Sequence, residues 1–449
     1  MKAGKSISIF GMGSVGLSQA VCLASRGYNV IGVDTVEEKV EAINRYQSYI
    51  FEPGLDHLLR ESIDRGFLHA TLDYRKAILD TDVTFIAVGT PSMEDGRLNL
   101  QYIKRSAETI ADILKIKESF HLVVVKSTVT PGTTERIIKP IIENGSGKRC
   151  GSRWGLCVNP EFLREGSAIK DTLEPDRIII GESDKNSGDM LNSLYGDLYD
   201  PHLPPVIRTN WTTAELIKYT NNAFLATKVS FINSIANLCQ KISGADVNVI
   251  ADGIGVDKRI GRLFLNAGLG WGGSCFPKDL RELTAYAQSI GVELPIVEAA
   301  SRVNRGQPLQ GVNLARKLLG DLRGKRFSIL GLSFKPDTDD LREAPSIKII
   351  QALINAGAKV VAHDPKALNN ARRIFGDLIE YEENVLACLR DSDCCILVTE
   401  WDEYRSISAD DFRNNMHRPV VIDGRRIYDP VKFVSIDLTL VGLGPTERN

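Results

Sequence analysis

The 449-residue sequence contains no uninterrupted apolar stretch that is long enough to cross a bilayer, and none with the layout of a signal peptide. It also lacks an excess of charge, because 55 Lys and Arg residues are balanced by 57 Asp and Glu residues. The net charge of −2 gives no basic field of the kind that binds nucleic acid or a membrane surface. We therefore expect a cytoplasmic globular protein without nucleic-acid or membrane partners, in which local cations and backbone N–H groups hold any acidic ligand.

Paired cysteine spacing is also missing, so the eight cysteines do not form a zinc pattern and we expect no metal. Cys150 and Cys157 flank the sequence GSRWGL and are near enough in the chain to pair, although a reducing cytoplasm favours two thiols. Five others lie in apolar patterns typical of a packed core: Cys22, Cys239, Cys388, Cys394 and Cys395.

A dinucleotide-binding pattern begins with the apolar strand at 6–10, which is followed by GMGSVG, a helical stretch and the strand YNVIGVD. Glycines at Gly11, Gly13 and Gly16 are typical of a tight turn that brings backbone close to a pyrophosphate at a helix N-terminus. Asp34 closes the second strand, where its carboxylate can accept from both ribose hydroxyls and would repel a 2′-phosphate. The pattern predicts a βαβ unit that binds NAD.

Further strands at 82–91, 121–135 and 153–168 run into polar turns, and we interpret DRIIIG at 176–181 as the last strand of this half. The turns are expected at the carboxyl ends of parallel strands, where such sheets bind ligands. A proline-rich connector at 200–206 follows.

Residues 210–243 then predict one long helix, which Gly244 ends. Thr212 and Glu215 have the spacing of a capping box at its start. More helical sequence continues to about residue 320, and a helical segment between two α/β parts is a plausible place for subunit contact.

A second α/β pattern follows, with strands in FSILGLSFKPDTDD, AKVVAHDP, DCCILVTEW and RPVVIDGRR. It repeats the first pattern in part, since a strand runs into a glycine turn and a later strand ends in Asp364. Ser333 and Lys335 stand where a dinucleotide loop requires small residues, so we expect another phosphate ligand here. The fold class is α/β: two doubly wound Rossmann-like domains joined by a long central helix and a helical dimerisation segment.

The stretch GWGGSCFPKDL places Cys275 between three glycines and a Pro-Lys-Asp sequence. Pro277 suits the first turn of a helix that begins near Ser274 or Cys275, with Lys278 and Asp279 one turn on from the thiol. A helix N-terminus and a nearby cation both favour the thiolate, so the setting is that of an activated nucleophile. The alternative is an inert cysteine in a loop.

Two other sets of residues can be interpreted either as catalytic groups or as solvent-exposed residues without a chemical role. Lys218 and Asn222 share a face of the long helix and either stabilise an oxyanion or lie at the surface with the lysine extended to solvent. Glu161, Arg164 and Glu165 follow a strand end in NPEFLREG and are either acid–base groups or a solvated turn.

The order of several blocks resembles the UDP-glucose/GDP-mannose dehydrogenase family over almost the whole chain. These blocks are GMGSVG, FEPGL, VGTP, KSTVTPGTTE, NPEFLREG, PDRIIIG, ELIKYTNN, GWGGSCFPKDL and GLSFKPDTDDLREAPS. Among the branches of the family, PDRIIIG and the glycine loop most resemble the one that oxidises UDP-glucose. The resemblance implies an NAD-binding domain at 1–200, a central helical and dimerisation domain at 205–305 and a UDP-sugar-binding domain at 318–449.

The same resemblance implies an NAD-dependent oxidation of UDP-glucose to UDP-glucuronate, in which a hydride first leaves C6 to give an aldehyde. The thiol of Cys275 would add to the aldehyde as a thiohemiacetal, which loses a second hydride to become a thioester that water releases. A homodimer or higher homo-oligomer is expected.

The family motifs imply catalytic roles for seven residues: Cys275 as nucleophile, Lys218 and Asn222 as oxyanion donors, Asp279 and Thr128 as groups that hold water, and Glu165 and Glu161 as carboxylates near the sugar. Cofactor contacts are implied for Gly11, Gly13, Val15, Gly16, Asp34, Lys39, Thr90, Thr128, Glu165, Lys278 and Arg342. Substrate contacts are implied for Glu161, Phe162, Leu163, Arg164, Lys218, Asn222, Phe264, Gly268 and Lys335, with Arg259 matching an arginine that in some relatives reaches a neighbouring subunit's substrate.

Other functions remain open on the sequence. The same chemistry on GDP-mannose or another nucleotide hexose differs only in the shape of the pocket. Trp271 stands where phenylalanine is common in the family, next to that pocket. A non-catalytic NAD-binding protein would be expected to lose at least one of the catalytic residues, and a single-step hydroxyacid dehydrogenase needs no cysteine.

Overall fold

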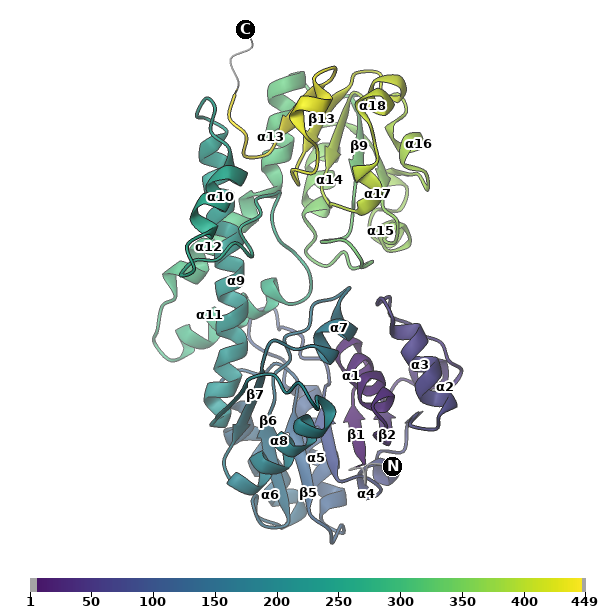
Figure 1. Ribbon diagram of the computed structural model, residues 1–449, viewed down its shortest axis with the longest axis vertical. Coiled ribbons are helices and arrows are strands. Elements are labelled where there is room, and N and C mark those ends of the chain that lie inside the picture. Colours follow the sequence, from purple (N-terminus) through teal and green to yellow (C-terminus); the bar gives the residue numbers. More distant parts are fainter. Residues whose placement is uncertain (1–5, 446–449) are drawn as a thin grey trace. The chain divides into compact units, whose positions relative to one another are not determined.

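The computed structural model of the chain describes residues 6–445, which form two compact units that divide between Asn221 and Asn222 (Figure 1). Each unit contains one sheet with helices on both of its faces. The long helix α9 (Trp211–Cys239) carries the chain from the first unit into the second. The predicted α/β class, with two doubly wound sheets and a long helix between them in the sequence, is confirmed.

The sheet of the first unit has eight strands in the order β3-β2-β1-β4-β5-β6-β7-β8, and only the β6–β7 pair is antiparallel. The strands are β1 (Ile7–Phe10), β2 (Val30–Val33), β3 (Leu68–Thr71), β4 (Val83–Ile86), β5 (His121–Val125), β6 (Trp154–Val158), β7 (Ile178–Glu182) and β8 (Val206–Thr209). The helices are α1 (Ser14–Ser25), α2 (Glu37–Asn44), α3 (Leu55–Asp64), α4 (Tyr74–Leu79), α5 (Gln101–Leu114), the π-helix η1 (Thr134–Ile138), α6 (Lys139–Ser146), α7 (Ala168–Leu173) and α8 (Lys185–Leu198).

Helices cover both faces of this sheet. Successive residues of a strand point to opposite faces, so they belong to two different cores. Leu122 and Val124 of β5 pack in one core with α1, α3 and α8. Val123 and Val125 pack in the other core with α4, α5 and α6. The near-continuous apolar strands of the sequence therefore reflect a sheet that is covered on both sides.

The second unit repeats the plan with six parallel strands in the order β11-β10-β9-β12-β13-β14. The strands are β9 (Arg326–Leu330), β10 (Lys359–His363), β11 (Glu380–Tyr381), β12 (Cys394–Leu397), β13 (Val420–Asp423) and β14 (Asp437–Leu440). The helices are α10 (Val247–Gly255), α11 (Phe276–Ser289), α12 (Pro295–Gly306), α13 (Pro308–Leu319), α14 (Pro345–Asn355), α15 (Leu368–Phe375), α16 (Val385–Leu389), α17 (Asp402–Arg405) and α18 (Ala409–Asn415), with 3-10 turns η2 (Gly376–Leu378) and η3 (Pro430–Phe433).

Cysteines in this unit follow the same two-sided pattern. Cys394 and Cys395 are fully buried in the cores on opposite faces of the second sheet, as the core interpretation predicts. No disulfide links any of the eight cysteines, all of which lie within the described range, so Cys150 and Cys157 are separate thiols.

The start of α9 differs from the sequence prediction in two respects. Strand β8 follows β7 in the sheet, so the interpretation of DRIIIG as the last strand is wrong. The predicted capping box is also wrong, because Asn210 caps the helix by accepting from the Thr213 N–H at 2.8 Å. Glu215 instead accepts from two distant backbone N–H groups.

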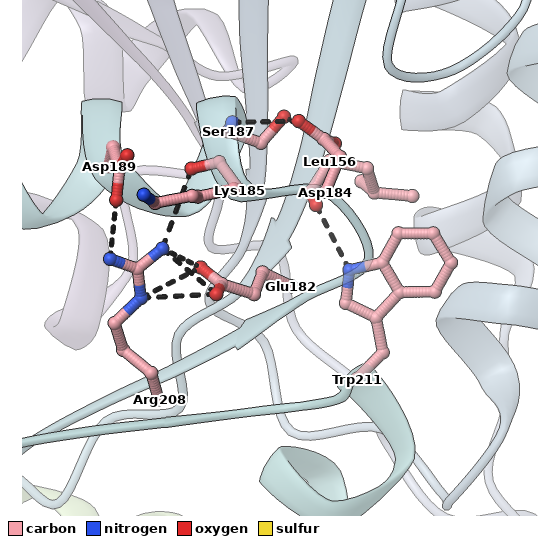
Figure 2. A network of polar contacts seen from close by, with 8 residues as sticks. All are labelled: Leu156, Glu182, Asp184, Lys185, Ser187, Asp189, Arg208 and Trp211. Atoms are coloured by element: carbon pink, nitrogen blue, oxygen red, sulfur yellow. Dashed lines mark hydrogen bonds and ion pairs between the residues drawn. The ribbon is translucent and has the colours of Figure 1, made fainter.

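Polar contacts fix β8 and the first turn of α9 to the first sheet, as Figure 2 shows. Arg208 of β8 lies with its guanidinium against both carboxylate oxygens of Glu182 on β7 and contacts Asp189 on α8. The indole N–H of Trp211 donates to the Leu156 carbonyl at 2.9 Å. An edge strand and a helix terminus are thereby held by charge-assisted and side-chain hydrogen bonds.

A buried polar network lies at the opposite end of the sheet, where the strands begin. Nδ1 of His121 lies 3.0 Å from the Thr81 carbonyl oxygen, so it carries the proton that this bond needs. Nε2 then accepts from the Thr84 hydroxyl at 2.7 Å. Burial, strengthened by the charge of Lys117, lowers the pKa of His121 from 6.5 to about 3.

This network predicts a specific loss of stability in acid. Below pH 6.5 the unfolded chain takes up a proton at His121 that the folded chain excludes until about pH 3, so stability falls as the pH decreases through this window. Replacement His121→Gln is expected to make the urea midpoint of the first unit less dependent on pH between about 7.5 and about 5.5. The exposed His57→Gln is the control and should keep the wild-type dependence, and an unchanged dependence in His121→Gln would refute the assignment.

Candidate active site

Three glycines shape the turn between β1 and α1 in the first unit. Gly11 has a φ of +89°, and a Cβ on it would lie 2.8 Å from the Ala87 carbonyl oxygen. A Cβ on Gly16 would lie 1.9 Å from the Gly11 carbonyl oxygen, which only a glycine permits. Gly13 has open space where its Cβ would be, so ligand can approach the backbone there. The residues present therefore fit a pyrophosphate at the N-terminus of α1.

Asp34 follows the last residue of β2 and lies beside this turn. Its carboxylate accepts from the N–H of Met12 at 2.9 Å and from that of Val36 at 3.0 Å, and Lys39 lies 3.6 Å away. Asp34 and the glycine turn are thus one hydrogen-bonded structure, with a carboxylate where the ribose of a dinucleotide lies in this fold.

Other predicted cofactor residues follow the neighbouring strands. Thr90 lies in the loop after β4, and Thr128 lies in the loop after β5. Because β1, β4 and β5 are adjacent parallel strands, both loops open at the edge of the sheet where the glycine turn lies. Val15 is half-buried on α1 and packs against the core below. From β1 the chain adds β2 and β3 on one side of the sheet, and β4 and the later strands on the other side. The strand order therefore reverses between β1 and β4, and sheets of this kind bind their ligands at such a point.

The loop after β6 contains a buried ion pair. Glu161 Oε1 lies 2.9 Å from Lys218 Nζ on α9, and Glu161 Oε2 accepts from the Leu163 N–H at 2.6 Å. Burial raises the pKa of the Glu161 carboxyl, but the charge and hydrogen bond of Lys218 outweigh burial and place the pKa below its ordinary value. Glu161 is consequently ionised and engaged by a cation and a backbone amide.

A second cation, Lys126, lies near the ion pair of Glu161 and Lys218. The sequence prediction did not include it. Its ammonium donates to Asn159 Oδ1 at 2.8 Å. The pKa of Lys126 is lowered to about 8. Burial is the main cause and the charge of Lys218 adds to it, while the charge of Glu161 acts in the opposite direction. Its position directly after β5 was the available signal, because polar residues at the ends of these strands are in place to meet a ligand.

The ring of Phe162 lies near two cations. The Arg177 guanidinium lies 3.7 Å from the centre of its ring and the Lys218 ammonium lies 5.5 Å from it. Arg164, by contrast, extends to solvent and pairs with Asp171 at 2.5 Å. A cavity of about 290 Å³ in this unit is lined by residues that include Lys126, Glu161, Phe162, Leu163, Arg164 and Arg177.

Cys275 lies in the second unit, where it is the N-cap residue of α11. Asp279 donates its backbone N–H to the Cys275 carbonyl at 2.8 Å, and Pro277 occupies the first turn, as predicted. The thiol is half-buried and lies 3.5 Å from the Ser274 hydroxyl. It is thus placed at a helix N-terminus, a setting that favours the thiolate form of a cysteine.

A cluster of charged and amide groups surrounds Asp279, one turn into α11. The Asn222 amide donates to Asp279 Oδ2 at 2.6 Å, and the Lys278 ammonium lies 2.7 Å from Asp279 Oδ1 and 3.1 Å from Glu282 Oε2. Asp279 is almost completely buried. Burial lowers the pKa of Lys278, but its two carboxylate partners outweigh burial and raise it, so the lysine is charged.

The glycines before Cys275 let two loops of this unit approach each other. A Cβ on Gly272 would lie 2.4 Å from the Glu343 carbonyl oxygen. Gly273 has a φ of +86°, faces the Phe334 ring and donates its N–H to the Arg342 carbonyl at 2.8 Å. The structure therefore brings the cysteine loop to the loop that contains Lys335. The side chain of Arg342 extends to solvent and pairs with Asp340.

Three further predicted residues belong to the second unit. Phe264 has a φ of 64°, a conformation uncommon for a residue with a bulky side chain, and its ring lies 6.4 Å from that of Phe276. A Cβ on Gly268 would lie 2.9 Å from the guanidinium of Arg425. The sequence prediction did not include Arg425, which lies two residues after the end of strand β13. Arg259 pairs with Asp257 and is highly exposed, away from these contacts.

The second sheet has an aspartate that corresponds to Asp34, but its hydrogen bonds differ. Asp364 follows β10 and accepts from the N–H groups of Leu332 and Ser333 and from the Trp401 indole. Its other oxygen accepts from two backbone N–H groups of its own turn. This carboxylate is buried, and groups of its own unit donate to both of its oxygens.

No three His, Cys, Asp or Glu side chains are grouped for a metal ion among residues 6–445. Within the same range no helix is both long and apolar enough to cross a membrane.

The comparisons with known proteins agree with this arrangement. Models of the NAD-binding, central and UDP-binding domains of the UDP-glucose/GDP-mannose dehydrogenase family match residues 5–199, 212–306 and 328–430. The chain belongs to this family. It is an NAD-dependent oxidoreductase whose substrates are nucleotide sugars.

Individual relatives are similar over nearly their whole length. UDP-glucose 6-dehydrogenase AglM of Haloferax volcanii is 46% identical over 423 residues, covering 94% of this chain and 96% of the relative. GDP-mannose 6-dehydrogenase of Pseudomonas savastanoi is 38% identical over 443 residues, covering 96% of each. The solved UDP-glucose dehydrogenase of Pyrobaculum islandicum has a TM-score of 0.89 at 38% identity, covering 97% of this chain and 96% of that one.

Proposed function

We propose that the chain oxidises UDP-glucose to UDP-glucuronate with two molecules of NAD, through a covalent intermediate on Cys275. The observation that carries this proposal is the placement of Cys275 at the N-terminus of α11, one turn before Asp279 with its partners Asn222 and Lys278. The choice of UDP-glucose is supported by relatives named as UDP-glucose 6-dehydrogenases at 40–46% identity.

The cofactor would be held in the first unit by the glycine turn and Asp34, with Lys39, Thr90 and Thr128 nearby in sequence or along the sheet edge. When bound, NAD takes up the hydrides that oxidation of a primary alcohol to a carboxylate releases, one per molecule. Asp34 would accept from the ribose hydroxyls, and its negative charge disfavours the 2′-phosphate of NADP. Glu165, Lys278 and Arg342 remain proposed cofactor contacts.

The thiol of Cys275 supplies the nucleophile that the second oxidation needs. Its sulfur adds to the aldehyde carbon, and the carbonyl oxygen takes up a proton to give a thiohemiacetal that again carries a transferable hydride. Loss of that hydride leaves a thioester. Water then adds to the thioester carbon, the C–S bond breaks and the thiol is restored. The alcohol, two NAD and one water thus give a carboxylate, two NADH and three protons.

Lys218 and Asn222 are proposed to stabilise the negative charge that develops on the substrate oxygen in these steps. The contact of Glu161 with Lys218 supports a refinement: Glu161 holds the ammonium in place rather than acting as a base, because its lowered pKa makes it a weak base and both of its oxygens are already engaged. Asp279 and Thr128 are proposed to hold water, and Glu165 to act as the carboxylate near the sugar. Phe162, Leu163, Arg164, Phe264, Gly268 and Lys335 remain proposed substrate contacts.

GDP-mannose is the second candidate substrate, because relatives named GDP-mannose 6-dehydrogenases are 38% identical. A panel of UDP-glucose, GDP-mannose and UDP-N-acetylmannosamine, assayed for NADH release, separates the candidates. We expect the highest kcat/KM with UDP-glucose, and a higher value with either of the others would replace it.

Replacement Cys275→Ala is expected to lower UDP-glucuronate formation on the order of a thousandfold or more, because no adduct forms and the aldehyde keeps no transferable hydride. Binding of NAD and UDP-glucose should change little, since the glycine loop, Pro277 and Lys278 remain. Product masses and calorimetric binding measure the two effects. Cys150→Ala is the matched control, because Cys150 is a half-buried thiol outside the proposed machinery. Acid production by Cys275→Ala at a near-normal rate would make the thiol structural.

A homodimer is proposed on the exposed apolar face of α9. Phe224, Phe231 and Leu238 recur every seven residues on this helix and are 65%, 52% and 55% exposed. A stripe of this spacing suits a second copy of the same helix, as in helix pairs with a seven-residue repeat. Arg259, which is highly exposed, would be available to a neighbouring subunit. The thiols of the chain suit the cytoplasmic location proposed for such a dimer.

Sedimentation of Phe231→Asp tests the dimer. The wild type is expected to sediment as a dimer at micromolar concentration, and the variant at half that mass, because a charge would be buried in the apolar contact. The control Leu378→Asp, at an exposed leucine of the second unit outside α9, should leave the sedimenting mass unchanged. A monomeric wild type would rule out the dimer.

A further inference from the structure

The motif FEPGL, residues 51–55, has no part in the chemistry described so far, yet its glutamate makes strong contacts. Glu52 is only 7% exposed. One carboxylate oxygen accepts from the Gly166 N–H at 2.8 Å and the other from the Ala168 N–H at 2.6 Å, 114 and 116 residues further along the chain. A buried carboxylate is retained only where such bonds replace its hydration, so these two contacts fix the place of the loop after β6.

The loop that Glu52 holds contains the proposed catalytic carboxylate Glu165. On its other side, Asp171 accepts from the Arg164 N–H at 2.9 Å and from the Ser167 hydroxyl at 3.2 Å. Gly166 has a φ of +77°, a sharp turn directly after Glu165. Glu165 is therefore flanked by backbone groups that are held from both sides, by Asp171 and by Glu52.

The same segment reaches the cofactor turn through Tyr49. The Tyr49 hydroxyl donates to the Met12 carbonyl, and the Met12 N–H donates to Asp34. Burial, strengthened by the charge of Asp34, raises the pKa of Tyr49 well above its ordinary value, so the phenol remains a donor. Leu55 is fully buried in the core beneath, which anchors the segment. Residues 49–55 thus contact the glycine turn at one end and the loop of Glu165 at the other.

We propose that Glu52 is a positioning residue for Glu165, and that residues 49–55 set the distance between the catalytic carboxylate loop and the cofactor turn of the first unit. The inference rests on the proposed function of Glu165. A glutamine at position 52 keeps the size of the side chain but offers one oxygen instead of two, so that its NH₂ group faces one of the two N–H donors and one bond is lost.

The first experiment compares Glu52→Gln, Glu165→Gln and the double variant. Glu52→Gln is expected to lower kcat between about tenfold and about a hundredfold, the cost of a small misplacement of a catalytic group. In the Glu165→Gln background the same change is expected to cost less than about twofold, because the group that it positions is already gone. An equal loss in both backgrounds would show that Glu52 acts only on the fold and would overturn the proposal.

Glu61→Gln is the matched control, because Glu61 is an exposed carboxylate on the next helix that pairs with Arg65, and kcat should be unchanged. If Glu52→Gln does not fold, Glu52→Asp serves in its place, since its shorter side chain cannot reach both amides.

The second experiment is independent of turnover. Amide hydrogen exchange in the peptide that spans residues 160–172 is expected to be faster in Glu52→Gln than in wild type, and unchanged in Glu61→Gln. Unchanged exchange in Glu52→Gln would overturn the positioning role. Faster exchange in Glu52→Gln, in a protein whose wild type makes no UDP-glucuronate from UDP-glucose, would instead keep the positioning contact and reject the proposed function.

Discussion

The buried ion pair between Lys218 and Glu161 is the contact on which the candidate site of the first unit depends. Only 4% of the lysine side chain and 9% of the glutamate side chain are exposed, so both charges have lost most of their hydration. Such a pair contributes little or nothing to stability compared with an apolar pair of the same size. The ion pair instead has a geometric role, because it holds the Lys218 ammonium of α9 beside the loop after β6.

Two neighbours on α9 make the same kind of contact with other loops. One turn earlier, Glu215 accepts from the N–H groups of Gly132 at 2.5 Å and Thr134 at 2.9 Å, in the loop after β5. One turn later, Asn221 accepts from Arg177, directly before β7, at 2.7 Å. Residues spaced by three on one helix thus hold three successive segments at the edge of the sheet where ligands bind. Mutations in the first turns of α9 are expected to act on all of these loops together.

The sequence predicted those parts of the site that depend on local order. The glycine spacing, Asp34 after the second strand and Pro277 in the first turn of α11 each concern neighbours in the chain, and each lies where it was expected. Glu52 could not be assigned in this way, because its partners lie more than a hundred residues away.

Glu215 shows the opposite error. Its spacing from Thr212 matched a capping box, but two distant backbone donors bind its carboxylate and Asn210 caps the helix instead. Burial raises the pKa of Glu215 and makes such hydrogen bonds necessary, which a local pattern does not reveal. The position of Lys126 directly after β5 was a local signal, but only the folded chain places it near Glu161 and Lys218.

In the proposed function, the cysteine at the N-terminus of α11 is the group that separates a four-electron oxidation from a simple dehydrogenation. The most direct test is to count NADH released for each UDP-glucose consumed by the wild-type protein, while the products are identified by mass. Two NADH per sugar, with UDP-glucuronate and no accumulated aldehyde, is the expected result. One NADH per sugar with a stable aldehyde product would contradict the covalent role of Cys275.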